Sequence, residues 1–419
     1  MSPKDFYGKK VLILGLGLHG GGVAAAYWFF RQSAEVIVSD VRTRTELAPS
    51  IAKLTTLCNE YRLAHTGKRL SSIEYVLSKH RVDDVARADV VIQNPGVPRD
   101  SMFLSVAREH GIPIHNDASI FFTLVKHTPI IGVTGTRGKT TTVALIAEML
   151  KTTYPRAVAA GSAMPSGAVS FFSLLDRVLQ DEERGVPAPV VLELSSWQLE
   201  ILGAHGLGPH CAVVTNIRPD HLNRYASMEE YIDAKKNIIR FQSRPDDTTV
   251  LNADDPVLKT WTSDVLPAIR LHWFSKSQAL PCSLETIALP GEHNEENVRA
   301  AATVGEIYGV PQNMMCRVAT SFTGVPGRLE HVGSHRGRIF INDTTATSPD
   351  ATIAALTTVA GRSKKIILIA GGADKNLVFD EMGARIARTV KALVLLSGTA
   401  TPAIGTAATA AGYSGSCDF

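Results

Sequence analysis

The sequence predicts an α/β protein of three domains, each built on a largely parallel sheet. Short apolar runs recur along the chain and end in glycine or a polar residue, with helix-like stretches between them. Uniformly apolar strands that alternate with helices are typical of parallel sheets covered on both faces. A length of 419 residues also exceeds what one ordinary core supports. Ligands of such sheets bind beyond the carboxyl ends of the strands, so functional side chains are expected directly after each run.

The predicted strands can be followed in order along the chain. In the first two domains they are VLIL, EVIVSD, DVVIQNPG, PIIGVTG, PVVLELSS and CAVVTN, and in the third RIFIND, KIILIAGG and ALVLLSG. The pattern breaks at FFTLVKHTP, and GVPGR forms a turn-rich hinge. We therefore expect domains at residues 1–125, 126–323 and 324–419.

The composition argues against several classes of protein. A formal charge of +3 without a basic run gives no reason to expect nucleic-acid binding. The five cysteines lack CxxC spacing, which argues against a zinc site or a disulfide framework and favours a reducing cytosol. The polar start MSPKDFYGKK does not resemble a signal peptide, and no apolar run approaches the roughly 20 residues of a membrane helix. We expect a cytoplasmic protein that does not enter a membrane.

A glycine-rich loop, GLGLHG, follows the first predicted strand. Gly15, Gly17 and Gly20 match G-x-G-x-x-G, and Asp40 ends the next strand, where a ribose-binding acid is expected. Such glycines let the backbone approach a pyrophosphate at a helix N-terminus. The motif fits NAD, and hence a dehydrogenase, but it fits a nucleotide-sugar diphosphate equally well. The alternative without a ligand is a tight turn.

A second loop, GVTGTRGKTTT at residues 132–142, has the features of a phosphate loop. Its backbone N–H groups would cradle oxygens, Lys139 would reach the terminal phosphates, and Thr140 could touch Mg²⁺. Val143, Ile146 and Leu150 then share one face, which predicts a helix that starts at the loop. The glycine spacing, T-G-x-x-G-K-T, is shorter than in a strict Walker A motif.

From residue 132 to residue 375 the chain resembles the Mur ligases, the ATP-dependent amino-acid-adding enzymes of peptidoglycan synthesis. The motifs that carry the resemblance occur in the family's order: GVTGTRGKTTT, LELSSWQLE, NIRPDHLNRY, YIDAKK, LNADDP, GEHNEENVRAA, GVPGRLE and INDTTATSP. GLGLHG, SDVR and NPGVP look like the UDP-binding domain of the D-glutamate-adding branch, so NAD drops out. The resemblance implies a Rossmann-like UDP-binding domain, a central P-loop ATPase domain with a parallel sheet, and a Rossmann-like C-terminal domain.

The resemblance also implies the reaction. ATP would phosphorylate the carboxylate of UDP-N-acetylmuramoyl-L-alanine to an acyl phosphate, and the amine of D-glutamate would then attack it. The implied cofactors are ATP and Mg²⁺, and the implied state is a monomer. Such chemistry needs a γ-phosphate clamp, a metal, and neutralisation of two anions pressed together.

Five residues would carry the chemistry or hold its metal ions by this resemblance. Lys139 would clamp the γ-phosphate, while Thr140 and Glu193 would ligate the first Mg²⁺. His221 would ligate a second Mg²⁺, although on its own it would be read as a structural histidine, since Mg²⁺ favours oxygen. Lys235 would react with CO₂ to give a carbamate, which requires a neutral amine and hence a lowered pKa. The neighbouring Lys236 fits an ordinary solvated lysine.

The remaining contacts are carried over position by position. Asn294 and Asn297 lie one helical turn apart, so their amides could read adenine, while Arg328 would meet phosphate and Asp343 ribose when the third domain closes. Surface salt bridges are the alternative for Arg328, Asp40 and Arg42. The implied ATP contacts are Gly135, Thr136, Arg137, Gly138, Lys139, Thr140, Thr141, Asn294, Asn297, Arg328 and Asp343. The implied substrate contacts are Gly15, Gly17, Leu18, His19, Gly20, Asp40, Arg42, Asn94, Gly96, Ser162, Ser195, Thr347 and Lys375, with uridine held by Asp40 and Arg42.

The chain departs from the family pattern in four places. Arg137 and Ser162 stand where asparagine is usual, and Thr345 replaces a glutamate-binding lysine, although Lys375 and Thr347 match that site. The family also continues beyond the equivalent of residue 419 with a serine–phenylalanine loop that holds the amino acid. We therefore expect a shortened third domain or a fragment, with an exposed sheet edge.

Several alternatives remain open at this stage. Another amino-acid-adding Mur activity or a folylpolyglutamate synthase would share the ATP motifs, but the GLGLHG domain argues against folylpolyglutamate synthase and the later adding enzymes. A nucleotide-binding remnant without turnover would bind ATP and release no phosphate. A dehydrogenase would bind NAD and give no ADP.

Overall fold

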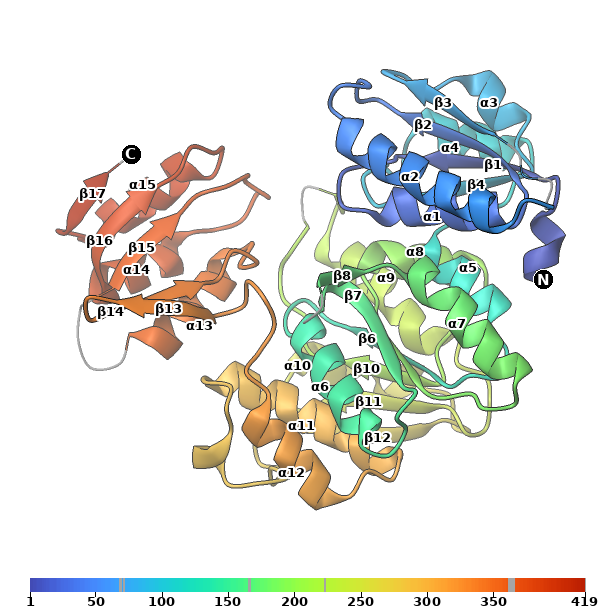
Figure 1. The fold of residues 1–419 in the computed structure, drawn as a ribbon. Coiled ribbons are helices and arrows are strands. Elements are labelled where there is room, and N and C mark those ends of the chain that lie inside the picture. The colour runs from blue at the N-terminus through green and yellow to red at the C-terminus, as the bar shows by residue number, and fades with distance from the viewer. Residues whose placement is uncertain (68–69, 71, 165–166, 222–223, 361–365, 419) are drawn as a thin grey trace.

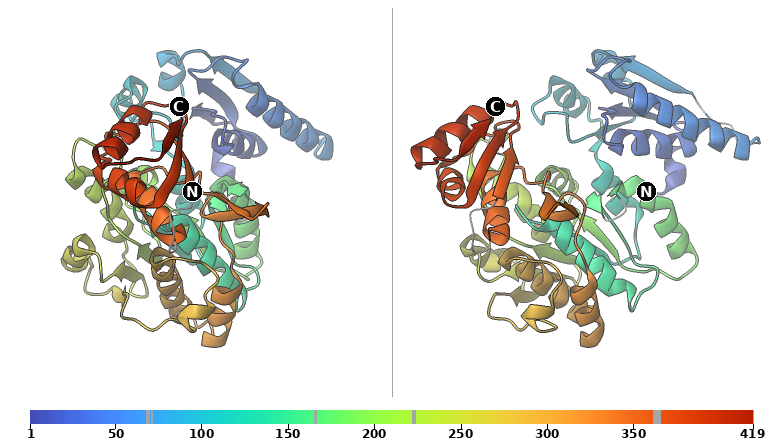
Figure 2. Two further views of the ribbon diagram at one scale, coloured as in Figure 1. Left: turned by 90° about the vertical axis from the view of Figure 1, so that its left-hand side faces the viewer. Right: turned by 60° about the vertical axis from the view of Figure 1, so that its left-hand side comes forward.

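The computed structural model describes residues 1–67, 70, 72–164, 167–221, 224–360 and 366–418. They form three α/β bodies, as the sequence predicts (Figure 1). The first domain (blue) lies above the central domain, and the third domain (orange to red) lies beside it (Figures 1 and 2). None of the described helices combines the length and apolarity needed to cross a membrane.

The first domain is a five-stranded, wholly parallel sheet in the strand order of a Rossmann half. In sheet order its strands are β3 (Ile73–Leu77), β2 (Glu35–Asp40), β1 (Lys10–Leu14), β4 (Val90–Gln93) and β5 (Ile114–His115). Its helices are η1 (Pro3–Phe6), α1 (Gly21–Arg31), α2 (Ala48–Ala64), α3 (Val82–Ala86) and α4 (Met102–Glu109). Helices α1 and α2 cover one face, while α3 and α4 cover the other.

The central domain is a seven-stranded sheet, parallel except where β8 pairs antiparallel with β7. In sheet order its strands are β12 (Arg270–Phe274), β11 (Thr248–Asn252), β10 (Cys211–Val214), β6 (Ile130–Thr134), β9 (Val190–Glu193), β7 (Val158–Met164) and β8 (Gly167–Val169). Its helices are α5 (Asp117–Leu124), α6 (Lys139–Lys151), α7 (Phe171–Glu183), α8 (Ser196–Ala204), α9 (Met228–Arg240), α10 (Pro256–Lys259), η2 (Thr260–Asp264), η3 (Leu284–Thr286), α11 (Glu292–Ile307) and α12 (Gln312–Ser321). Helices α6, α11 and α12 cover one face, and α5 and α7 to α9 the other.

The third domain pairs a three-stranded parallel sheet with a separate hairpin. Its strands are β13 (Glu330–His335) and β14 (Arg338–Asn342) in the hairpin, and β15 (Ile366–Ala370), β16 (Val390–Leu395) and β17 (Ser416–Asp418) in the sheet. Its helices are α13 (Pro349–Val359), α14 (Asp380–Thr389) and α15 (Thr401–Ala410). The core gathers residues of these helices around Leu393 and Leu395 of β16.

The register of the sheets brings the predicted motifs together. Strand β6 pairs with β9 so that Val133 faces Glu193, and with β10 so that Thr134 faces Val214. The loops that follow β6, β9 and β10 therefore meet at one edge of the central sheet. This edge faces the third domain across a cavity lined by residues of both domains.

An apolar contact joins the first domain to the central one. Trp28 and Phe29 of α1 pack against Phe172 of α7, and the Trp28 indole N–H donates to Asp176 at 2.9 Å. Helix α5, which the predicted boundary at residue 125 assigns to the first domain, packs against α7 and α8 instead. Its apolar face, including Phe121, is buried in the same core as those helices.

One predicted strand has a different environment from the one expected. The run RIFIND was expected to lie in a parallel sheet covered on both faces, but β14 is half of an antiparallel hairpin. Ile339 is 67% exposed and Phe340 53% exposed. A run of apolar residues specifies a strand, but the elements that cover it are decided by the rest of the fold.

Candidate active site

The phosphate loop joins the end of β6 to the start of α6, as predicted. Gly138 caps α6 with φ of 81°, and a Cβ there would lie 2.3 Å from Oδ1 of Asn297, so only glycine fits. The Lys139 ammonium donates to the carbonyls of Gly135 and Thr136, each at 3.0 Å. Burial lowers the pKa of Lys139 to about 8. The loop thus offers a helix N-terminus and a lysine to an anion.

Glu193 meets this loop from the end of β9. Its carboxylate accepts a hydrogen bond from the Thr140 hydroxyl at 3.0 Å. The guanidinium of Arg328, which follows the hinge into the third domain, donates to the same hydroxyl at 2.9 Å. A loop residue, a strand-end acid and a cation from another domain therefore converge at one point, as expected from the sequence.

Lys235 lies beneath the same loop and is 2% exposed. Its Nζ donates to the Gly135 carbonyl at 2.9 Å and to the Thr134 hydroxyl at 3.4 Å, and sits 4.8 Å from the centre of the Tyr231 ring. Burial first, and then the charge of Lys139, hold the pKa of Lys235 well below its ordinary value. Lys236 points elsewhere and pairs with Asp264 at 2.7 Å. The predicted contrast between the two lysines agrees with this geometry.

His221 follows β10 in a left-handed backbone conformation with φ of 56°. Its Nε2 lies 3.6 Å from Oδ2 of Asp220, and its backbone N–H donates to Oδ1 of Asp220 at 2.9 Å. Burial lowers the pKa of His221 to about 4, against the opposing charge of Asp220. The imidazole is therefore neutral at pH 7 and keeps a lone pair for a ligand.

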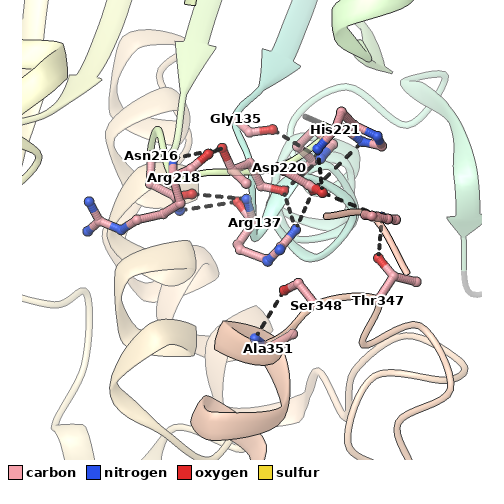
Figure 3. Close-up of polar contacts among 12 residues, drawn as sticks. Gly135, Arg137, Asn216, Arg218, Asp220, His221, Thr347, Ser348 and Ala351 are labelled. Atoms are coloured by element: carbon pink, nitrogen blue, oxygen red, sulfur yellow. Dashed lines mark hydrogen bonds and ion pairs between the residues drawn. The ribbon is translucent and has the colours of Figure 1, made fainter. Parts of the chain in front are cut away.

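Asp220 connects three parts of the site (Figure 3). Its Oδ2 accepts from Nη1 of Arg137 at 2.9 Å, and its Oδ1 lies 3.5 Å from Nζ of Lys375 in the third domain. Lys375 also donates to the Thr347 hydroxyl at 3.3 Å. Lys375, which also binds Thr347, is therefore connected to the phosphate loop through the carboxylate of Asp220.

A cavity of about 310 Å³ lies between α11 of the central domain and α13 of the third. Asn294, Asn297, Arg328 and Asp343 all line it, so the structure brings these four residues together, and their contact with a nucleotide stays a prediction. Asn297 donates to Asn294 at 3.1 Å and accepts from the Thr142 hydroxyl at 3.2 Å, so it also holds helix α6.

The same cavity shows residues that the sequence reasoning missed. One wall is the face of α13 formed by Asp350, Ala351, Ala354 and Ala355, and His293 lies opposite on α11. Three alanines at helical spacing make a flat, narrow face against which a planar ring can pack. The helical spacing of the alanines could have indicated this face from the sequence. The sequence of α13 alone does not show that the face lines a cavity shared with α11.

Hydrogen bonds to Asp40 and from Asn94 stabilise the first glycine loop. Oδ2 of Asp40 accepts from the backbone N–H groups of Leu16 and Gly17 at 2.9 and 3.0 Å, and Oδ1 accepts from that of Arg42 at 2.9 Å. The Asn94 amide donates to the Gly15 carbonyl. Asp40 is 2% exposed, so the structure shows it shaping the loop, and a direct contact with uridine stays a prediction.

The other predicted substrate residues lie either around the glycine loop of the first domain or in the central domain. Leu18, His19, Arg42 and Gly96 are exposed around the loop. Ser195 caps α8, accepting from the Gln198 N–H at 3.3 Å. Ser162 lies in β7, and its side chain is outside the described set.

One glycine outside the predicted motif proves essential to the loop. A Cβ on Gly22 would lie 2.3 Å from the Leu16 carbonyl oxygen and 2.7 Å from that of Gly15. Gly22 thus allows α1 to approach the loop closely, a role usually given to the third glycine of G-x-G-x-x-G. The run of glycines from Gly20 to Gly22 was the signal that could have located it.

The fold and the site together define an α/β protein with a phosphate-type loop, beside which residues of the third domain line a cavity. Three family models match the chain: "Mur ligase MurD-like, N-terminal domain" over residues 9–116, "Mur ligase middle domain" over 133–280, and "Mur ligase, glutamate ligase domain" over 327–416. The chain belongs to the Mur ligase family and is a ligase.

Relatives and solved structures agree with this assignment. A Roseiflexus protein named UDP-N-acetylmuramoylalanine–D-glutamate ligase is 39% identical, with 94% of this chain and 84% of that protein covered. A protein of the same name from Symbiobacterium thermophilum is 35% identical, with 97% and 86% covered. The crystal structure of UDP-N-acetylmuramate-alanine ligase from Thermotoga maritima matches with a TM-score of 0.61 at 20% identity, covering 98% and 90%, which shows the shared fold alone.

Proposed function

We propose that this chain is the ATP-dependent ligase that joins D-glutamate to UDP-N-acetylmuramoyl-L-alanine. The observation that carries the proposal is the likeness to proteins of that name over 94% of the chain. The site supports it, because a phosphate clamp, a strand-end acid and a third-domain cation meet at one point. In this proposal residues 1–125 hold the UDP substrate, 126–323 hold ATP, and 324–419 bring the amino acid.

ATP supplies the phosphoryl group that activates the substrate carboxylate as an acyl phosphate, and Mg²⁺ neutralises charge on the phosphates. Lys139, Arg328 and the N-terminus of α6 hold and orient the polyphosphate. The amides of Asn294 and Asn297 would meet the base, and Asp343 would meet the ribose. Closure of the third domain over this cavity excludes water, which would otherwise consume the acyl phosphate.

The donor set beside the phosphate loop fits Mg²⁺. Thr140 and Glu193 present oxygen atoms in mutual contact at 3.0 Å. The described residues contain no cluster of three or more His, Cys, Asp or Glu side chains, so the ion would share its shell with phosphate oxygens, as Mg²⁺ commonly does. For a second ion, His221 offers a neutral imidazole. Lys235 would fit only as a carbamate, for which its buried, weakly basic amine is suited.

The proposal is tested by phosphate release from ATP in buffer with Mg²⁺ and bicarbonate. Release should require both UDP-N-acetylmuramoyl-L-alanine and an amino acid, and D-glutamate should give the highest kcat/KM. Release with a different amino acid would identify another adding activity of the family. Binding of ATP and the UDP substrate without release would identify a nucleotide-binding remnant and overturn the proposal.

A further inference from the structure

The contacts of Arg137 set it apart from the other cations of the site. It belongs to the phosphate loop, yet its guanidinium turns to Asp220, with Nη1 2.9 Å from Oδ2. The Asp220 side chain is only 4% exposed and also faces Lys375 at 3.5 Å. We call Arg137, Asp220, Lys375 and Thr347 the Asp220 cluster (Figure 3).

Among the described residues, none accepts a hydrogen bond from one edge of the Arg137 guanidinium. Nη1 is engaged by Asp220 and, at 3.4 Å, by the Thr136 carbonyl. Nε and Nη2 are buried, and no described residue accepts a hydrogen bond from either atom. Buried N–H groups without an acceptor are costly and rare in folded proteins. Nε and Nη2 share one edge of the plane, and this edge matches the two oxygens of a carboxylate or phosphate.

The charges of the cluster call for an anion. Arg137 and Lys375 bring two positive charges against one carboxylate, that of Asp220. Oδ2 of Asp220 accepts from Arg137 and Oδ1 faces Lys375, so this carboxylate is already shared between the two cations and offers no donor to a further anion. The cluster therefore has one unit of positive charge in excess.

The position of the cluster indicates which anion it receives. Phosphate already has Lys139 and Arg328, whose contacts converge on the loop carbonyls and Thr140. Arg137 lines the same cavity as Arg328, but its Nη1 is connected to Lys375 of the third domain through Asp220. The amine that attacks the acyl phosphate must arrive between the loop and the third domain, so its carboxylates lie beside this cluster.

Thr345 of the third domain does not supply a second charge for a dicarboxylic amino acid. The hydroxyl of Thr345 donates to the Gly327 carbonyl at 2.6 Å, so this side chain is uncharged and turned toward the hinge. We propose that the free Nε–Nη2 edge of Arg137 binds one carboxylate of the incoming amino acid, opposite Lys375. Arg137 is then a specificity-determining residue for an acidic donor. This inference rests on the proposed function.

The test compares Arg137→Gln and Arg137→Lys with Arg240→Gln. Arg240 lies on α9 and pairs with the exposed Asp233, so its replacement is a matched control for the loss of a surface guanidinium. Arg137→Gln should raise the KM for D-glutamate roughly 10- to 150-fold, the range for lost hydrogen bonds to a charged group. The KM for ATP should change less than about threefold. Acyl phosphate formed without amino acid, trapped by hydroxylamine, should persist.

Amide analogues give a second, independent measurement. D-glutamine and D-isoglutamine each replace one carboxylate of D-glutamate by a neutral amide. The wild type should discriminate against both, and each Arg137 variant should lose its discrimination against one of them. Arg137→Lys keeps the positive charge but lacks the paired N–H groups of the guanidinium, so it should recover part of the affinity for D-glutamate. It also replaces Arg137→Gln in the test if that variant does not fold.

The outcomes separate this inference from the proposed function. If Arg137→Gln raises the KM for ATP or abolishes the trapped acyl phosphate, Arg137 is a phosphate ligand and the inference is wrong. Undiminished discrimination against both amides in both variants would also overturn it. A wild-type chain that releases no phosphate with any amino acid refutes the proposed function, and the inference with it.

Discussion

Replacing Lys235 by methionine should remove activity while leaving the fold as stable or more so. Lys235 is 2% exposed, and its ammonium has two uncharged acceptors, the Gly135 carbonyl at 2.9 Å and the Thr134 hydroxyl at 3.4 Å. Methionine has a similar length and no charge. Both acceptor groups keep another partner, because Lys139 bonds the Gly135 carbonyl at 3.0 Å and Thr134 donates to Leu194 at 2.7 Å.

The magnitude follows from two opposing terms. Two hydrogen bonds are lost, but a buried ammonium without a directly bonded carboxylate no longer has to be desolvated, which costs several kcal/mol. We expect a net gain of roughly 1 kcal/mol, at the lower end for replacing buried charges by apolar side chains. That gain corresponds to a rise in Tm of about 2–4 °C for a domain of this size.

The stability gained by Lys235→Met should become smaller as the pH rises. Because the pKa of Lys235 is lowered in the folded state, the unfolded chain binds more protons between that pKa and about 10.4. Wild-type stability therefore rises with pH across this window, and the advantage of the methionine variant shrinks.

The assay pairs thermal unfolding at pH 7 and pH 9.5 with phosphate release at pH 8. Lys236→Met is the matched control, since its exposed pair with Asp264 contributes up to about 1 kcal/mol and it should retain turnover. A Lys235→Met protein that turns over like the wild type would refute the assigned role. A drop in Tm of more than about 4 °C would refute the stability reasoning.

Three further predictions follow from single contacts. Gly22→Ala places a Cβ 2.3 Å from the Leu16 carbonyl and should destabilise the first domain by roughly 1–3 kcal/mol in thermal or urea unfolding; an unchanged midpoint contradicts this. Arg328→Gln should raise the KM for ATP at least about tenfold and spare that for the UDP substrate, so equal rises would speak against a phosphate contact. Burial lowers the pKa of His221 to about 4, so its imidazole resonances should stay constant from pH 8 to 5.5; a midpoint near 6.5 would show an unburied ring.

Much of the fold and the phosphate loop could be predicted from local sequence. Residues 130–151 contain a buried strand, a glycine turn, a lysine–threonine pair and a helix in one continuous stretch, and the structure shows these elements in place. The paired asparagines of α11 were predictable for the same reason, because their shared face depends only on helix geometry. The exposed hairpin strand β14 was not, since its covering layers come from other parts of the chain.

The sequence by itself indicated nine of the strands, the two glycine loops and the acids and lysines that follow them, because each depends on backbone conformation over a few residues. Only the tertiary structure decided which of these groups touch. Arg328 reaches Thr140 across 188 positions, and Arg137 reaches Asp220 across 83. It also decided that Asp40 accepts hydrogen bonds from its own loop, and that no described residue accepts one from Nε or Nη2 of Arg137. Such pairings depend on how separate sheets and domains pack, and on the burial that results, which no local pattern encodes.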